Sequence, residues 1–204
     1  MDSNAELVEH LKRAGVLKTP DLIEAFVSID RADFVTKEFK DDPYGDHPLS
    51  IGYGQTISQP YTVAFMLELL RPQAGEKILD VGSGSGWTSA LLAHVAGPGG
   101  RVFAAERIPE LTEFAQNNVS KYDFKNLEFR KAEKDILGLP DEAPFDRILV
   151  SASAVKIPDE LINQLKEGGV MVIPVLNSVF KIVKKRDGDI SEEEHPGFVF
   201  VPLL

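Results

Sequence analysis

Residues 77–87 read Lys-Ile-Leu-Asp-Val-Gly-Ser-Gly-Ser-Gly-Trp, and the order of these parts decides the fold class. A short apolar run ends at Asp80 and Val81, three glycines follow at alternate positions, and apolar residues at helical spacing begin directly afterwards. This order predicts a buried strand, a turn whose backbone approaches a ligand closely, and a helix N-terminus that points at the same place. A glycine-rich turn that only packs a strand against a helix is the alternative.

The spacing of the glycines narrows the kind of ligand. Gly82, Gly84 and Gly86 are spaced Gly-x-Gly-x-Gly, whereas the dinucleotide fingerprint is Gly-x-Gly-x-x-Gly. The Lys-Ser/Thr ending of a phosphate-binding P-loop is also missing, because Trp87 and Thr88 stand in its place. The turn, with Ser83 between two of its glycines, therefore favours a nucleoside ligand without a pyrophosphate. S-adenosylmethionine is the commonest such ligand on a scaffold of this type.

A second acid stands where a partner for a ribose is expected. Residues 101–106 are predicted to form the next strand, and Glu106 lies 20 positions after Gly86. An acid about 20 residues beyond the last glycine can accept hydrogen bonds from both hydroxyls of a ribose. An ordinary solvated acid at a strand end is the alternative for Glu106, and its combination with Asp80 and the glycines argues against that alternative.

Composition excludes several classes of protein. The chain has 204 residues, enough for one domain with a short extension, and its 43% hydrophobic and 26% charged content is that of an ordinary globular protein. The net charge of −10 argues against binding to nucleic acid or to an anionic membrane. The sequence has no cysteine, which excludes disulfides, thiolate catalysis and Cys-based zinc sites. With no apolar signal region near Asp2 and Glu6, we expect a cytoplasmic protein, and we expect a monomer.

Strands and helices alternate along most of the chain. Helices predicted over 5–14 and 20–29 form a small N-terminal subdomain, and residues 40–60 are dense in Gly, Pro and Asp and predict an ordered functional loop. Then follow predicted helices over 61–70, 86–96, 109–121 and 158–166 and strands over 77–81, 101–106, 126–131, 145–151 and 170–176. Residues 178–185 and 198–203 are predicted to pair as antiparallel strands joined by Asp187-Gly188, with Ser191–Glu194 an exposed acidic loop.

This pattern predicts an α/β fold with a doubly wound, mostly parallel sheet and an antiparallel C-terminal strand pair. We expect residues 1–60 to hold the N-terminal helices and the loop, and residues 61–204 to form the sheet domain. The ligand crevice of such a sheet lies at the carboxyl ends of its strands. Asp80, Glu106, the segment 151–155 and the loop 50–60 are therefore expected to meet there.

The loop and the glycine turn together resemble one family. Gly52-Tyr53-Gly54-Gln55-Thr56-Ile57-Ser58-Gln59-Pro60, followed by a helix and then by residues 79–86, is similar to protein-L-isoaspartate O-methyltransferases. The segments 143–148, 156–158, 165–169 and 200–203 resemble the same family in the same order. The resemblance implies a Rossmann-like methyltransferase fold. It also implies metal-free methyl transfer from S-adenosylmethionine to the free α-carboxylate of isoaspartyl residues in damaged proteins, the first step of their repair.

Three departures from the family pattern stand near the expected site. A Gly-Asp-Gly after the third strand is replaced by residues 130–135, Arg-Lys-Ala-Glu-Lys-Asp, where Glu133 is the first candidate for the adenine contact and Asp135 the second. Residues 151–155 read Ser-Ala-Ser-Ala-Val where Thr-Ala-Ala-Ala is usual, and Leu176-Asn177 stands where a glycine is common.

The expected substrate group needs no general base. A backbone α-carboxylate has a pKa near 3.3–3.7 and is ionised at neutral pH, so the site has only to hold one oxygen in line with the methyl group. The resemblance favours Ser58 as the residue that contacts this carboxylate, with Thr56 as a lesser candidate, while helix capping is the alternative for both. Ile57, Val155 and Ile157 are candidates for the apolar wall around the substrate, and each suits the core equally well.

Other classes of function stay open to different degrees. Residues 151–154 lack the Asn/Asp-Pro-Pro-aromatic sequence of nucleic-acid amino-methyltransferases and the acids of metal-dependent catechol-type enzymes. A methyltransferase for one dedicated peptide carboxylate is closer. A cofactor-binding adaptor without catalysis is the non-enzyme alternative.

Overall fold

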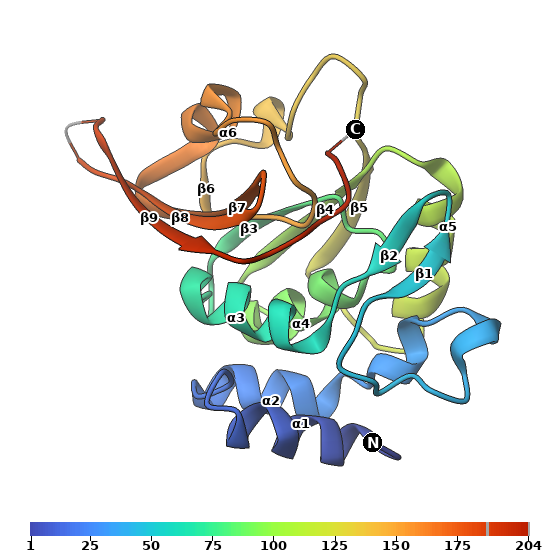
Figure 1. The fold of residues 1–204 in the computed structure, drawn as a ribbon. Helices are drawn as coiled ribbons and strands as arrows, with labels where there is room; N and C mark the ends of the chain where they lie inside the picture. Colours follow the sequence, from blue (N-terminus) through green and yellow to red (C-terminus); the bar gives the residue numbers. More distant parts are fainter. Residues whose placement is uncertain (187, 204) are drawn as a thin grey trace.

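A mixed sheet organises the chain, for which the computed structural model describes residues 1–186 and 188–203 (Figure 1). In the described residues this sheet has seven strands in the order β5-β4-β3-β6-β7-β8-β9. The strands are β3 Lys77–Val81, β4 Arg101–Glu106, β5 Leu127–Lys131, β6 Phe145–Val150, β7 Leu165–Val175, β8 Ser178–Lys184 and β9 Ile190–Pro196. β3 to β7 are parallel and β8 and β9 are antiparallel, so the predicted fold class is confirmed.

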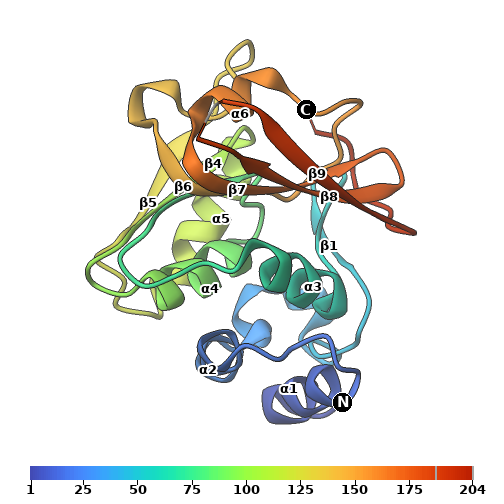
Figure 2. The same ribbon diagram turned by 90° about the vertical axis from the view of Figure 1, so that its left-hand side faces the viewer.

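The helices fall on both faces of this sheet. They are α1 Asn4–Arg13, α2 Pro20–Ser28, α3 Pro60–Leu70, α4 Trp87–Ala96, α5 Pro109–Val119 and α6 Asp159–Gln164, with 3₁₀ turns η1 Arg31–Phe34, η2 Lys37–Phe39 and η3 Pro140–Glu142. Figures 1 and 2 show α3 and α4 against one face, with α1 and α2 as a further layer beneath them and α6 on the opposite face. No helix of the described residues is long and apolar enough to cross a membrane.

Alternate residues of the strands feed two separate cores. Ile78, Val102 and Leu149 belong to the cluster under α1 to α5, whereas Leu79 and Phe103 belong to the cluster under α6. Because successive side chains of a strand point to opposite faces, strands covered on both sides are apolar throughout. That is why their sequences predicted them so well.

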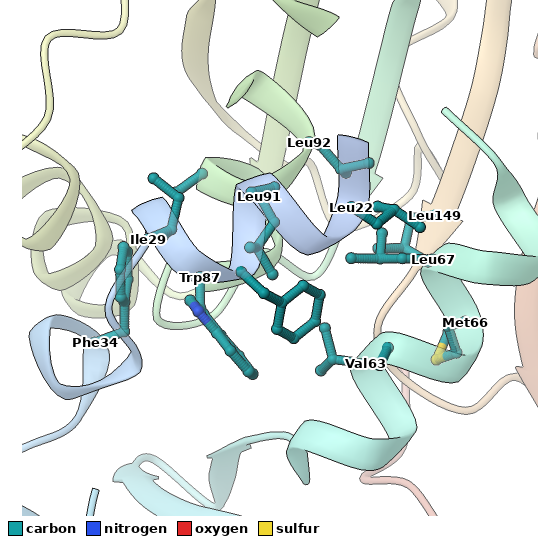
Figure 3. Close-up of a cluster of buried hydrophobic side chains, with 14 of the residues drawn as sticks. Leu22, Ile29, Phe34, Val63, Met66, Leu67, Trp87, Leu91, Leu92 and Leu149 are labelled. Atoms are coloured by element: carbon teal, nitrogen blue, oxygen red, sulfur yellow. The ribbon is translucent and has the colours of Figure 1, made fainter. Parts of the chain in front are cut away.

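The first core runs across the predicted domain boundary at residue 60. Figure 3 shows Leu22 of α2 beside Leu67 of α3 and Leu149 of β6. Buried side chains from both sides of residue 60 thus share one cluster. The division into 1–60 and 61–204 stays a prediction.

The loop predicted over residues 40–60 contains a short hairpin. β1 (Leu49–Gly52) pairs antiparallel with β2 (Gln55–Ile57), and Tyr53 and Gly54 turn between them with positive φ angles of 56° and 71°. The density of turn formers predicted the turn but not the strands, because each strand has only three or four residues.

The last strand lies elsewhere than predicted. β9 spans residues 190–196, so the acids Glu192, Glu193 and Glu194 lie in a strand rather than in an exposed loop, and residues 198–203 form no strand in the described chain. β9 is an exposed edge strand, and charged side chains are typical of such edges. The alternation in 198–203 reflects partial burial of Phe198 and Phe200 against the first core without ladder hydrogen bonds. Of the predicted turn, Asp187 lies outside the described residues.

Candidate active site

A pocket opens where the order of the strands reverses, between the carboxyl ends of β3 and β6. This is the place where doubly wound sheets bind ligands. The turn after β3, the end of β4, the segment after β5, the segment after β6, residues of the hairpin and the C-terminal segment all contribute to its wall. Among the lining residues are Gln55–Ser58, Val81–Ser85, Trp87, Thr88, Ala105–Ile108, Ala132–Lys134, Ile136–Gly138, Ser151, Ala152 and Val201–Leu203.

The glycine turn is held open by its backbone. Gly82 and Gly84 have φ angles of +80° and +51°, a region that favours glycine. The Gly82 and Ser83 amides donate to the Ala105 carbonyl at 2.8 and 3.2 Å, which ties the turn to the end of β4. A side chain at Gly84 would approach Ile51 of the hairpin at 3.3 Å. The turn therefore leaves the pocket clear for a ligand.

Glu106 lies in the pocket wall at the end of β4. Its carboxylate accepts from the Gly84 amide at 2.9 Å and from the amides of Arg107 and Ile108 at 2.8 and 2.9 Å. These bonds fix the carboxylate, and a carboxylate has about four acceptor positions, so capacity is left for a ligand hydroxyl. The solvated alternative is wrong, since the side chain is buried.

Asp80 lies behind the wall rather than in it. It is 0% exposed, and it accepts from the hydroxyls of Thr88, Ser89 and Ser151 at 2.7, 2.6 and 3.2 Å. Burial raises the pKa of Asp80, against the effect of these hydroxyl donors. Since Thr88 and Ser151 do line the pocket, their hydroxyls connect Asp80 to the pocket wall.

Two polar atoms of the pocket residues lack a partner. The Ser83 Oγ and the Trp87 Nε1 are buried and have no hydrogen-bond partner in the described part of the chain. Buried polar groups are hydrogen-bonded in nearly all native structures. Figure 3 shows Trp87 projecting into the first core beside Ile29 and Phe34. Trp87 Nε1 therefore lies in the core, whereas the Ser83 Oγ, with the glycine turn and Glu106, fits a nucleoside ligand that carries hydroxyl groups.

The end of β5 distinguishes the two candidates for an adenine contact. Glu133 lines the pocket together with Ile136, which is 44% exposed, and Leu137. Asp135 is not among the lining residues. The structure thus places Glu133, the first candidate, beside two apolar side chains that could contact a base.

The hairpin residues predicted for the substrate also reach the pocket. Thr56, Ile57 and Ser58 line it, and Ile57 is buried while the other two are half-buried. Ser58 is not the cap of α3: the N-cap is Gln59, and no side chain caps the helix there. The capping alternative is therefore wrong for Ser58.

Besides Asp80, three predicted site residues lie outside the pocket wall. Val155 is 83% exposed, and Ile157 packs against the second core. Gly86, with φ +86°, is the N-cap of α4, and a side chain there would meet Ala115 of α5 at 3.1 Å. The glycine at position 86 therefore allows α4 and α5 to approach each other closely. No set of three or more His, Asp or Glu side chains that could hold a metal ion occurs within residues 1–186 and 188–203.

Comparison with known proteins decides the family. The model of the family described as protein-L-isoaspartate(D-aspartate) O-methyltransferase (PCMT) matches residues 2–204. The chain belongs to this family. Protein-L-isoaspartate O-methyltransferases of Methanopyrus kandleri and Aeropyrum pernix are 45% and 44% identical to it, over 97% and 100% of this chain and 89% and 80% of their own lengths.

Solved structures agree with this assignment. A structure described as a protein-L-isoaspartate O-methyltransferase from Plasmodium falciparum, in complex with S-adenosyl-L-homocysteine, is 27% identical with a TM-score of 0.88, covering 100% of this chain and 99% of that one. A second structure named protein-L-isoaspartate O-methyltransferase is 27% identical with a TM-score of 0.87 and covers 98% of this chain and 65% of that one. This PCMT-family chain is therefore an S-adenosylmethionine-dependent methyltransferase.

Several pocket residues of this PCMT-family chain were not predicted. Trp87 and Thr88 follow the glycines directly, and proximity to the turn was the available signal. The C-terminal segment reaches the pocket because the Ser153 amide donates to the Val201 carbonyl at 2.8 Å and the Leu203 amide donates to the Ser153 carbonyl at 2.9 Å. Its apolar alternation indicated a strand, and no local pattern in the sequence indicated contact with residues 50 positions earlier.

Proposed function

We propose that this protein transfers a methyl group from S-adenosylmethionine to the free α-carboxylate of L-isoaspartyl residues in damaged proteins. The family match over residues 2–204 carries this proposal. The pocket supports it, because one continuous wall joins the glycine turn and Glu106 to the hairpin residues Thr56–Ser58. A cofactor and a second substrate can therefore meet in one cavity.

We propose that the Gly82, Ser83 and Gly84 segment, Glu106 and Glu133 hold the cofactor. Bound S-adenosylmethionine supplies a methyl group on a positively charged sulfur. Glu106 would accept from the ribose hydroxyls and Glu133 from the adenine amino group, while Ser83 Oγ offers an unpaired hydroxyl. Asp80 would act through the Thr88 and Ser151 hydroxyls that it orients.

We propose that Ser58, with Thr56 and Ile57, holds the substrate carboxylate. The carboxylate is ionised at neutral pH and is itself the nucleophile, so no side chain has to remove a proton. Holding one oxygen in line with the methyl group can lower the barrier by roughly 7–11 kcal/mol. Val155, exposed beyond the pocket wall, would contact the polypeptide that flanks the modified residue, whereas Ile157 suits a supporting role beneath it.

The protein's setting is part of the same proposal. We propose a monomer that acts in the cytoplasm on proteins and peptides and not on nucleic acid or membranes. The net charge of −10 supports the exclusion of polyanionic substrates. Light scattering at several protein concentrations tests the monomer, and cell fractionation tests the location.

Twin peptides test the proposed reaction. An isoaspartyl peptide and its aspartyl twin differ in which carboxylate is free, and a site that holds the neighbouring backbone rejects the wrong connectivity because its polar groups are left unpaired. With labelled S-adenosylmethionine we expect kcat/KM to be at least about a hundredfold higher for the isoaspartyl peptide. Equal rates would refute the isoaspartyl specificity.

A panel of unrelated isoaspartyl peptides separates the remaining alternatives. A repair enzyme should methylate most of them. Activity on one sequence alone would identify a dedicated peptide-carboxylate methyltransferase, and cofactor binding without transfer to any of them would identify an adaptor.

A further inference from the structure

Arg31 is a buried cation at the base of the hairpin. Its side chain is 0% exposed, although arginine is almost never fully buried unless it is paired. Within residues 1–186 and 188–203, no carboxylate oxygen lies within 4 Å of a guanidinium nitrogen of Arg31. The charges of Asp46 and Asp42 favour the charged form of Arg31 from a distance. Their carboxylates contact other side chains, Asp46 that of His10 at 3.4 Å and Asp42 that of His47 at 3.2 Å.

Backbone carbonyls take the place of a carboxylate around this guanidinium. Nη1 donates to the carbonyl of Pro43 and, at 3.4 Å, to that of Gly45, and Nη2 donates to His47 at 3.1 Å and to Ser58 at 3.2 Å. All four acceptors belong to the segment 43–58, which brings the hairpin to the pocket. One side chain thus ties both ends of this segment together, as the planar fork of arginine allows and an ammonium does not.

The bond to Ser58 also sets the direction of one peptide unit. The carbonyl of Ser58 and the amide of Gln59 belong to the same planar unit and point in opposite directions. Because the carbonyl points at Arg31, the Gln59 N–H points away from Arg31. Neither this N–H nor the Ser58 hydroxyl has a hydrogen-bond partner in the described part of the chain. Of the two, Ser58 lines the pocket and Gln59 does not, so the Ser58 hydroxyl is the donor available to a ligand there.

The guanidinium of Arg31 does not line the pocket but contacts two residues that do. Its Cζ is 5.5 Å from the centroid of the Trp87 ring, and Trp87 and Ser58 both line the pocket. The charged residues of the wall itself are two acids and two bases at or after the ends of β4 and β5: Glu106, Arg107, Glu133 and Lys134. Among the described residues, Arg31 is the cation that contacts Ser58 directly. Burial lowers the pKa of Arg31 to about 10, so it stays charged at neutral pH.

We propose that Arg31 is a positioning residue that makes the Ser58 end of the pocket selective for a carboxylate. It fixes the Ser58–Gln59 peptide and so the position of Ser58 in the pocket wall, and its buried charge favours an anion over a neutral group. The inference rests on the proposed function.

Two substitutions and one control separate this role from a structural one. The measured quantity is the ratio of affinities for an isoaspartyl peptide and for the same peptide with a carboxamide in place of its α-carboxylate. Binding is measured by calorimetry with S-adenosylhomocysteine present. Arg31→Met removes the charge and the fork, whereas Arg31→Lys keeps the charge. Arg147→Met is the matched control. It removes a largely buried arginine of β6 whose guanidinium pairs with the Glu76 carboxylate at 2.9 Å.

In the wild type we expect a clear preference for the carboxylate. Arg31→Met should lower that preference by about tenfold or more, Arg31→Lys should keep most of it with a lower kcat, and Arg147→Met should leave it unchanged. A folded Arg31→Met protein that binds S-adenosylhomocysteine normally and keeps the wild-type ratio would overturn the proposal.

A measurement on the wild type covers the case in which the variants do not fold. Salt screens exposed charges far more than buried ones, and at about 1 M the screening length is about 3 Å. If Arg31 provides the selectivity, the ratio should survive at about 1 M sodium chloride within a factor of about three. Loss of the ratio in salt would assign it to surface cations and overturn the proposal. A wild type that methylates no isoaspartyl peptide would instead refute the proposed function.

Discussion

Replacing Ser58 by alanine tests the assignment of the substrate contact. The hydroxyl of Ser58 lies in the pocket wall and makes no hydrogen bond to the described residues, and Gln59 rather than Ser58 is the cap of α3. Its removal therefore breaks no bond of the folded chain, and the free energy of unfolding should change by less than about 0.5 kcal/mol. A hydrogen bond to a charged group is worth about 1.5–3 kcal/mol. The loss in kcat/KM for an isoaspartyl peptide should accordingly be about 10- to 150-fold, because about 1.4 kcal/mol corresponds to tenfold.

The assay is initial-rate methyl transfer at several peptide concentrations, with affinity for S-adenosylhomocysteine measured in parallel. The affinity should stay within about twofold of the wild type, since Ser58 lies on the hairpin side of the pocket. Ser50→Ala is the matched control: Ser50 is an exposed residue of β1 outside the pocket, whose Oγ accepts from the Gly52 amide at 3.3 Å. If Ser58→Ala and Ser50→Ala have equal and nearly wild-type kcat/KM, the assignment of Ser58 to the substrate is wrong.

Four further changes test the rest of the site. Glu106→Ala should weaken S-adenosylhomocysteine binding by about 1.5–3 kcal/mol in calorimetry, and an unchanged affinity would remove it from the site. Glu133→Gln should cost more of this affinity than Asp135→Asn, because Glu133 lines the pocket and Asp135 does not; the reverse order would mean that the wrong acid was assigned. Gly86→Ala should lower the free energy of unfolding by about 2–5 kcal/mol in denaturant titrations. The left-handed backbone contributes about 1–2 kcal/mol of this loss and crowding of the new methyl group against α5 about 1–3 kcal/mol. Burial raises the pKa of Asp80 above its unfolded value, so its contribution to stability is present below about pH 4 and is lost as the pH rises through the raised pKa. The stability of Asp80→Asn relative to the wild type should therefore increase as the pH rises above about 4, and a difference that does not change with pH would contradict this.

The parallel part of the fold could be predicted because its physical causes are local. Strands covered on both faces, such as β3 and β4, are continuous apolar runs, and their bounds in the structure are those predicted. The glycine turn after β3 could equally be predicted from the sequence, because the positive φ angles at Gly82 and Gly84 leave few alternatives to glycine. In these segments the type of each residue indicates its own burial or backbone conformation.

The missed elements depend on partners that are distant in sequence. β9 carries three acids and no apolar alternation, because it pairs with β8 through its backbone and its side chains are mostly exposed. The alternation of residues 198–203 predicted a strand, yet Pro202 forms only an isolated bridge, with Ser153. Apolar alternation reports burial of side chains, and pairing of backbones has no comparable signal.

The candidate site divides in the same way. Glu106 was predicted from its spacing after the glycines and Ser58 from the family resemblance, and both line the pocket. Arg31 was not predicted, because nothing in the local sequence distinguishes a buried arginine held by four carbonyls from an exposed one. Its acceptors lie 12 to 27 positions away. Asp80 was predicted from its position after the strand, while its place behind the Thr88 and Ser151 hydroxyls depends on contacts that only the structure shows.

The position of the transferred methyl group tests the central claim most directly. An isoaspartyl peptide and its aspartyl twin, present together at equal concentration, compete for the enzyme in one tube with S-adenosylmethionine. Fragmentation mass spectrometry then identifies which peptide carries the methyl group and on which carboxyl. We predict a methyl ester on the α-carboxyl of the isoaspartyl residue, with the aspartyl twin modified at least about a hundredfold less. Methylation of both twins to the same extent, or a methyl group on any other atom, would contradict the account.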